Sequence, residues 1–452
     1  MKAALALTAV MMLGACVPAS APDVATRARI ADTTLPPMKR FAATPTTAPV
    51  RANADLARDF LELSFRMESG RKLPVLTRFD GPINVAVTGK PPATLASDLA
   101  SLTARLRREA GIDIRRTRQG KAHITIEAVS RRDIQKMLPQ AACFVAPNVS
   151  SLNEYRIARR QAKTDWTRLQ DRSQLAIFLP YDASPQEVRD CLHEELAQAI
   201  GPLNDLYRLP DSVFNDDNVH TVLTGFDMLI LRIYYDPALR SGMTEAQTAA
   251  ALPGILARLN PAGEGRPQRG TTATPRSWST AIETALGRAT SYSERYKAAQ
   301  DGLRIATRAG WRDHRRGFAH YTMGRVLQIK DPTAAQDHYD RANRYYNANP
   351  GTALHRAYTA TQMAAYAVSR GDGAEALRLT KSHLKTAEQA ENAALLATLL
   401  LIRSEAFALE GRVEEARRVR LDSIGWARYG FGPDWAVRAK LREIAALSPR
   451  NG

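Results

Sequence analysis

The stretch CLHEELAQAIGPLND (residues 191–205) decides how we interpret this chain. It continues a segment with strong helix-start signals, because Ser184 can cap a helix and Pro185 suits its first turn. Glu187 is placed to complete a capping box with Ser184. Gly201 is expected to end the helix in a left-handed conformation. The sequence therefore predicts a long, well-delimited helix that carries a His-Glu pair.

The His-Glu pair raises the question of a zinc site. A metal-binding HExxH motif that begins at His193 would need a second histidine at position 197, where the chain has Ala197. This register fails, because a single imidazole does not hold a catalytic metal. We therefore expect His193 to lie at the surface or at its boundary.

In the register one residue later, the stretch resembles the metzincin metalloproteases, whose frame is HExxHxxGxxH. Glu194, Gln198 and Asn204 occupy the three ligand positions of that frame, and Glu195 occupies the position of the general base. Two later segments, LPDSVFNDDN and LTGFDMLILRIYYDP, resemble the methionine turn and the last helix of those catalytic domains. The resemblance implies an α+β domain that covers about residues 80–245.

The same stretch is also similar to an uncharacterised bacterial family of exported proteins, known as a domain of unknown function. Its pattern Cys-x-x-Glu-Glu-x-x-Gln-x-x-Gly, followed by Asn-Asp, is present here from Cys191 to Asp205.

The ligand positions predict weak or no zinc binding. One carboxylate and two carboxamides are a poor donor set for zinc, so we expect neither catalytic zinc nor another cofactor. Three alternatives stay open. Glu194, Glu195, Asn204 and Asp205 could hold a hard cation, Glu195 could serve an unusual metal-dependent peptidase or cell-wall hydrolase, or Gln198 and Asn204 could form a structural polar network with the FNDDN loop.

Segments before this helix predict a sheet. Short runs with strand-like alternation cover residues 83–89, 112–116, 123–129 and 173–180, and a helical pattern covers residues 94–111. This order predicts a mixed sheet with helices packed on it, within an α+β domain at residues 53–258.

The last part of the chain predicts only helices. A linker-like segment at residues 259–277 leads into an alanine-rich region at residues 278–452. Three segments that start at Lys330, Gly371 and Gly411 align with one another, and each places an alanine at a matched position: Ala335, Ala376 and Ala416. The repeat resembles tetratricopeptide-like helical hairpins, which implies a protein-binding surface. An irregular helical bundle remains the alternative.

The N-terminus predicts export. Residues 1–15 resemble a lipoprotein signal peptide, and the sequence LGAC ends at Cys16, the residue that such signals acylate. A simple signal peptide with an incidental Cys16 is the alternative. Residues 16–52, rich in Pro, Ala and Thr, are expected to be a flexible tether. The net charge of +17 favours an anionic partner. Because the protein is expected to be exported, we do not expect this partner to be nucleic acid, and an anionic membrane surface is favoured instead.

Two cysteines remain once Cys16 is assigned to the lipid. Cys143 and Cys191 are an even pair in an oxidising compartment, which favours a disulfide over two buried thiols. Together these patterns predict a lipid-anchored cell-envelope protein, facing the periplasm from the outer membrane, with a non-catalytic metzincin-like domain and a helical-repeat domain that binds a protein.

Overall fold

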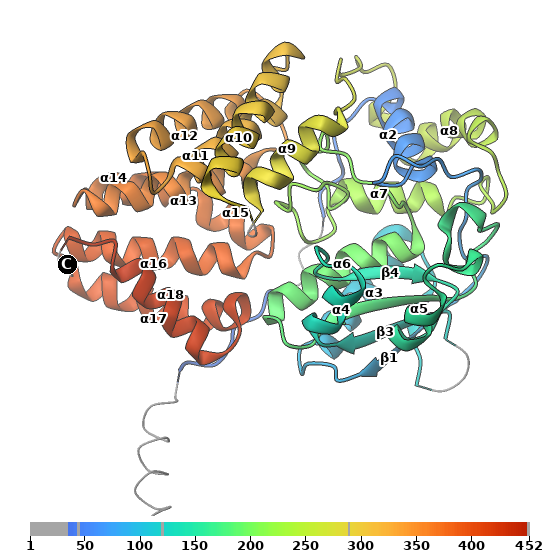
Figure 1. Cartoon of the computed structure of the whole chain (residues 1–452), viewed down its shortest axis with the longest axis horizontal. Helices are drawn as coiled ribbons and strands as arrows, with labels where there is room; N and C mark the ends of the chain where they lie inside the picture. The colour runs from blue at the N-terminus through green and yellow to red at the C-terminus, as the bar shows by residue number, and fades with distance from the viewer. Residues whose placement is uncertain (1–34, 43–45, 119–121, 288–289, 450–452) are drawn as a thin grey trace, which may run out of the picture. The chain divides into compact units, whose positions relative to one another are not determined.

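The computed structural model describes residues 35–42, 46–118, 122–287 and 290–449 (Figure 1). The chain from Pro37 to its end groups into one compact unit, which is described here. The proposed signal peptide and Cys16 lie outside the described residues. None of the helices in the described ranges combines the length and the apolar character needed to cross a bilayer.

The first half of the unit contains a five-stranded mixed sheet with the order β2-β1-β3-β5-β4. Its strands are β1 (Ile83–Gly89), β2 (Ile114–Arg116), β3 (Ile124–Val129), β4 (Phe144–Pro147) and β5 (Leu175–Pro180). All neighbouring strands are parallel except β4, which pairs antiparallel with β5 at one edge. The predicted mixed sheet is therefore confirmed, although the sequence pattern did not reveal the short strand β4.

Strand β5 is buried on both of its sides, which indicates that helices cover both faces of the sheet. Leu175, Ile177 and Leu179 face the main core, and Phe178 faces a smaller cluster with Ile134 on the other side. The helices of this half are α2 (Asn53–Phe65), α3 (Leu95–Ala110), α4 (Arg131–Met137), α5 (Leu152–Ala158), α6 (Pro185–Ile200), α7 (Gly225–Tyr234) and α8 (Glu245–Leu259).

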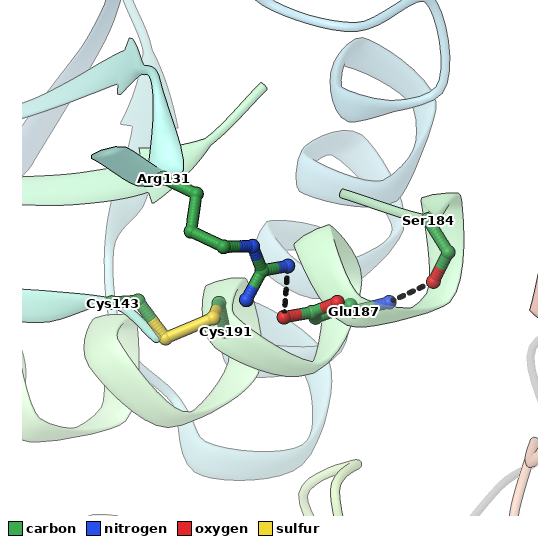
Figure 2. Close-up of a disulfide and its surroundings, with 5 residues drawn as sticks. All are labelled: Arg131, Cys143, Ser184, Glu187 and Cys191. Atoms are coloured by element: carbon green, nitrogen blue, oxygen red, sulfur yellow. Dashed lines mark hydrogen bonds and ion pairs between the residues drawn. A yellow bond between two sulfur atoms is a disulfide. The ribbon is translucent and has the colours of Figure 1, made fainter. Parts of the chain in front are cut away.

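Helix α6 is the predicted long helix, and its start follows the expected pattern in part. The Ser184 hydroxyl accepts a hydrogen bond from the backbone N–H of Glu187. The Glu187 carboxylate does not complete the capping box, because it forms an ion pair with Arg131 at 2.5 Å instead (Figure 2).

The end of α6 differs from the prediction. Gly201 has φ −142° and ψ −137°, so it is not left-handed. Gly201 packs closely against α7: a Cβ atom there would lie 2.6 Å from the Leu231 side chain, which would have to shift. The helix is ended by Arg172, whose buried guanidinium donates to the carbonyls of Gln198, Ala199 and Gly201 at 2.7, 2.8 and 2.6 Å. A cation suits this position, because it meets carbonyls that lack partners at the negative end of the helix dipole.

A disulfide joins α6 to the sheet. The sulfurs of Cys143 and Cys191 are bonded, with their Cα atoms 6.0 Å apart (Figure 2). It closes a loop of 48 residues, which corresponds to about 4 kcal/mol of stabilisation in the chain-entropy treatment. Helix α6 is thus covalently tied to the residue that precedes the edge strand β4.

The second half of the unit is helical. Its helices are α9 (Arg276–Leu286), α10 (Tyr292–Arg308), α11 (His314–Leu327), α12 (Pro332–Asn347), α13 (Ala353–Ser369), α14 (Gly373–Thr380), α15 (His383–Gln389), α16 (Ala393–Leu409), α17 (Val413–Phe431) and α18 (Asp434–Ala445). The three aligned segments begin α12, α14 and α17. Each of these helices packs against the helix before it: α12 against α11, α14 against α13, and α17 against α16. Ala335, Ala376 and Ala416 are all buried, as expected for the close contact between paired helices.

The two halves are joined by buried polar contacts. The side-chain amide of Gln186 in α6 donates to the side-chain oxygen Oδ1 of Asn392 at 3.1 Å. The Gln186 side-chain oxygen accepts a hydrogen bond from the backbone N–H of Ala394 at 2.8 Å. Arg189 donates to the backbone carbonyl of Glu391 at 2.7 Å. His355 of α13 contacts Asp217 at 2.9 Å.

The expectation of a flexible tether up to residue 52 is wrong for its described C-terminal part. The Lys39 N–H donates to the Gly425 carbonyl at 3.0 Å, and the Thr46 hydroxyl donates to Glu109 at 2.8 Å. Arg51 is buried and pairs with Asp59 and Asp211. Composition alone did not reveal these contacts, because they are made with residues far away in the sequence.

Replacing Arg172 tests how α6 is held. Arg172→Ala would leave three buried carbonyls at the end of α6 without donors, so we expect a loss of about 3 kcal/mol or more in unfolding free energy. Chemical denaturation measures this loss. Arg168→Ala is the matched control, because Arg168 is exposed and only its backbone is hydrogen bonded in the described structure. Equal stability of the two variants would contradict this account.

Candidate functional site

A cavity of about 620 Å³ opens beside the loop that follows α6. One wall comes from the end of α2 and the turn after it, another from residues 204–208, and a third from α9 and the segment before it. The described residues that line it are Arg58, Leu61, Glu62, Arg66, Met67, Glu68, Gly70, Asn204, Asp205, Leu206, Tyr207, Arg208, Asp216, Glu245, Thr274, Arg276, Ser279 and Glu283. We call it the acidic cavity.

Three carboxyl groups meet in this cavity. Glu68, Asp205 and Asp216 each place a carboxylate oxygen within 4.8 Å of the other two. Glu68 and Asp216 are the more exposed residues of the three, whereas Asp205 is half-buried and its buried Oδ1 has no hydrogen-bond partner. Burial and the neighbouring charges of Glu68 and Asp216 hold the pKa of Asp205 well above its ordinary value. Burial, reinforced by Glu68, raises the pKa of Asp216 to about 7.

The arginines of the acidic cavity form no ion pair with this cluster in the described structure, although the charge of Arg276 offsets it in part. Arg208 pairs with Asp59 and Glu62 at 2.8 and 2.7 Å, and Arg66 pairs with Glu245 at 3.1 Å. Arg276 donates to the backbone carbonyl of Glu68 at 2.7 Å, not to a carboxylate. The cavity therefore keeps an excess of negative charge when its acids ionise.

Two of the three residues at the metzincin ligand positions, Glu194 and Gln198, lie near Glu68, and the third, Asn204, lines the same cavity. Gln198 donates to the Glu68 carboxylate at 3.4 Å, and Asn204 donates to the backbone carbonyl of Glu62 at 3.0 Å. Glu194 lies close enough to Glu68 and Asp216 that, together with burial, their charges raise its pKa to about 8. The two carboxamides thus donate hydrogen bonds to protein groups, and Glu68 lies near Gln198 and Glu194.

Glu195, at the position of the general base, is buried and is not one of the residues that line the acidic cavity. Burial and the nearby Glu194 and Glu68 hold the pKa of its carboxyl group well above the ordinary value. The raised pKa favours the protonated form of this carboxyl group, and a protonated carboxyl cannot accept a proton from water.

The prediction that His193 lies near the surface is wrong. His193 is buried, and its Nδ1 accepts a hydrogen bond from the Leu223 N–H at 3.2 Å. Burial, with Arg189 and Arg105 nearby, holds the pKa of His193 well below its ordinary value. The histidine therefore positions the segment before α7 as a neutral acceptor.

Sequence reasoning missed Glu68 and found its neighbours. Asp205 belongs to the quoted motif, and Asp216 belongs to the FNDDN loop expected to join a polar network. Glu68 lies in the turn MESGRK after α2, where no local pattern distinguishes it from a surface acid. Only the fold brings it to the motif.

Residues 53–254 match a family model described as Protein of unknown function (DUF2927). This region contains the sheet, α6 and most of the acidic cavity, so the likeness to an uncharacterised domain is confirmed at that level. Neither a curated protein nor a solved structure shows a significant match to the chain.

Removing one carboxylate should change how stability depends on pH. Glu194 has its pKa raised from 4.5 to about 8, so the folded state keeps its proton to a higher pH than the unfolded state does. As a result, Glu194 does not lower the stability of the folded state below about pH 4.5, where it is protonated in both states. As the pH rises towards 8, the unfolded state loses this proton first, and the wild-type protein becomes less stable. We expect Glu194→Gln to be more stable than wild type at pH 8.5 by at least about 1 kcal/mol, or about 2 °C in melting temperature, and similar to it at pH 4.5.

Thermal unfolding followed by circular dichroism across this pH range makes the comparison. Glu388→Gln removes an exposed carboxylate of α15 and should leave the pH dependence as in wild type. If Glu194→Gln also follows the wild-type curve, the burial of an ionisable Glu194 is not a cost to the fold.

Proposed function

We propose that this chain is a lipid-anchored protein of the bacterial cell envelope, attached through Cys16 and facing the periplasm from the outer membrane. Its α+β half would be a metzincin-like domain without a catalytic metal, and its tetratricopeptide-like helical half would bind a protein partner. In this proposal the acidic cavity is a binding site and not a reaction centre.

The observation that carries the proposal is the state of the three ligand positions. Zinc would need ligand atoms that converge on one point, but the amide nitrogens of Gln198 and Asn204 donate to two different groups, the Glu68 carboxylate and the carbonyl of Glu62, which orients each amide separately. Carboxamides are also weak ligands for zinc, which prefers imidazole, thiolate and carboxylate. The residues present do not fit a zinc site, so we derive no reaction step from one.

The chemistry of the cavity supports a cationic ligand. Four of its acids, Glu68, Asp205, Asp216 and Glu283, form no ion pair in the described structure, whereas its arginines contact other groups. A lysine or arginine side chain, or an amino terminus, of a protein partner would supply the missing positive charge. Arg276 and Glu283 belong to α9, so the helical half contributes to the same cavity.

The order of the secondary-structure elements supports the proposed resemblance to metzincins and to helical repeats. A mixed sheet precedes the motif helix, as the metzincin resemblance implies, and α6 follows β5 directly. The helical pairs α11–α12, α13–α14 and α16–α17 support an array of hairpins.

A second candidate is favoured by the three clustered carboxylates. Oxygen ligands from Glu68, Asp205 and Asp216 within 4.8 Å of one another are the kind of group that a hard cation such as Ca²⁺ accepts. Such an ion would leave open the alternative of an unusual metal-dependent peptidase or cell-wall hydrolase, with Glu195 as its base.

The anchor is tested by replacing Cys16. When the chain is expressed with its own N-terminus in a bacterium with two membranes, we expect it in the membrane fraction with an acylated Cys16. Cys16→Ala should move it to the soluble periplasmic fraction, because a lipid-free chain loses the apolar anchor. Fractionation and mass spectrometry of the N-terminal peptide give the result, and a double Cys143→Ser, Cys191→Ser variant should stay with the membrane. An unmodified Cys16 in membrane-bound protein would refute the anchor.

The ligand of the acidic cavity is tested by titrating the full chain with tetralysine peptide and, separately, with Ca²⁺. At pH 8 we expect tetralysine binding that falls at least tenfold in a Glu68→Gln, Asp216→Asn variant, because two carboxylates are lost. Binding should weaken from pH 8 to pH 6, since Asp216 and Glu194 gain protons over that range.

A Glu388→Gln, Glu414→Gln variant, which loses two exposed carboxylates elsewhere, should bind as wild type does. Isothermal titration calorimetry measures all of these affinities. Stoichiometric Ca²⁺ binding that excludes the peptide would favour the second candidate. Stoichiometric zinc in the purified protein, with a peptidase activity abolished by Glu195→Gln, would overturn the non-catalytic proposal.

A further inference from the structure

A second cavity, of about 910 Å³, lies in the helical half among α10, α11 and α12. Six of the twelve described residues that line it are arginines: Arg304, Arg308, Arg312, Arg316, Arg341 and Arg344. Two more are histidines, His320 and His338, and none of the twelve is acidic. We call it the arginine cavity.

Most of these arginines have no counter-charge. Arg304 pairs with Asp301, but in the described structure Arg308, Arg312, Arg341 and Arg344 make no ion pair. All four are exposed. Four unpaired guanidinium groups around one cavity repel one another, so they do not contribute to the stability of the fold.

The inner wall of the cavity is closely packed. Gly317 of α11 lets α12 approach closely, because a Cβ atom there would lie 2.8 Å from Tyr346 and 3.1 Å from the Tyr345 Cβ. Tyr345 stacks on His320 with ring centroids 5.8 Å apart, and Arg316 lies over the Tyr345 ring at 5.3 Å. The Arg316 Nε is buried without a hydrogen-bond partner. An unused donor in a fixed side chain is what a bound acceptor would satisfy.

The histidines report the same excess of positive charge. His320 and His338 share a hydrogen bond between their Nδ1 atoms at 3.0 Å. Burial, with His338, Arg341, Arg316 and Arg344 nearby, lowers the pKa of His320 to about 3. Burial and Arg341 lower the pKa of His338, and Asp337, outside the cavity lining, opposes this only in part. A bound anion would reverse the repulsion.

We propose that the arginine cavity binds a ligand that carries two or more phosphate groups. Planar guanidinium groups bind phosphate oxygens in pairs, and four unpaired arginines exceed what one singly charged anion can neutralise. The same chemistry is offered by a soluble polyphosphate and by a lipid headgroup with several phosphates. The inference does not depend on the function proposed for the acidic cavity, which lies on other elements of the fold.

The test uses the full chain with Cys16→Ala throughout, so that no lipid anchor contributes to binding. Isothermal titration calorimetry with inorganic tripolyphosphate measures the soluble source, and co-sedimentation with phosphatidylcholine vesicles, with and without cardiolipin, measures the headgroup source. The cavity variant is Arg341→Gln, Arg344→Gln. The control is Arg417→Gln, Arg418→Gln, which removes the same charge from exposed positions of α17.

We expect at least tenfold weaker binding by the cavity variant and unchanged binding by the control. If the cavity variant alone binds tripolyphosphate more weakly, the ligand is a soluble polyphosphate. If this difference is seen with cardiolipin vesicles and not with tripolyphosphate, the ligand is a lipid headgroup. Tripolyphosphate binding should also raise the pKa of His338, which NMR of the imidazole nitrogens detects. No binding to either probe, or equal loss in both variants, would overturn the proposal. All four arginines replaced are exposed, so circular dichroism should show unchanged folding.

Discussion

Arg172 places a buried cation against the last carbonyls of α6, and the arrangement of both halves of the molecule depends on where that helix lies. The guanidinium replaces the missing amide donors at the helix end and also contacts Thr77 and Tyr234. The disulfide from Cys191 fixes the middle of α6 to the residue before β4. At its first turns, Gln186 and Arg189 bond to the loop before α16. The motif residues therefore lie on a helix held at three points.

The two cavities have opposite charge: acids predominate in the acidic cavity, and arginines line the arginine cavity. The acidic cavity contains carboxyl groups whose pKa values are raised by burial, and the pKa of Asp216, about 7, makes the charge of the cavity depend on pH near neutrality. The arginine cavity keeps its charge at any physiological pH, because guanidinium groups do not lose their protons. A chain with a net charge of +17 thus presents one site whose attraction for cations is adjustable and one whose attraction for anions is constant.

Local signals predicted the elements well and the contacts between them poorly. The pattern of β1, β3, β5 and α6 follows directly from alternation and capping residues, and Ser184 caps α6 as expected. Strand β4 is only four residues long, too short for its alternation to be distinctive. Gly201 was assigned to a left-handed turn, although close packing against Leu231 explains it. Glu68 and His193 were misjudged because their surroundings come from distant segments, which a single sequence does not reveal.

The match to the family of unknown function ends at residue 254, whereas the wall of the acidic cavity is completed by residues 274–283. The loop that covers Gln186 and Arg189 lies further along still, at residues 391–394. A relative that kept the matched region and lost the helices would expose an amide and a guanidinium that are hidden in this chain. The helical half therefore covers polar groups of the matched region that would otherwise be exposed.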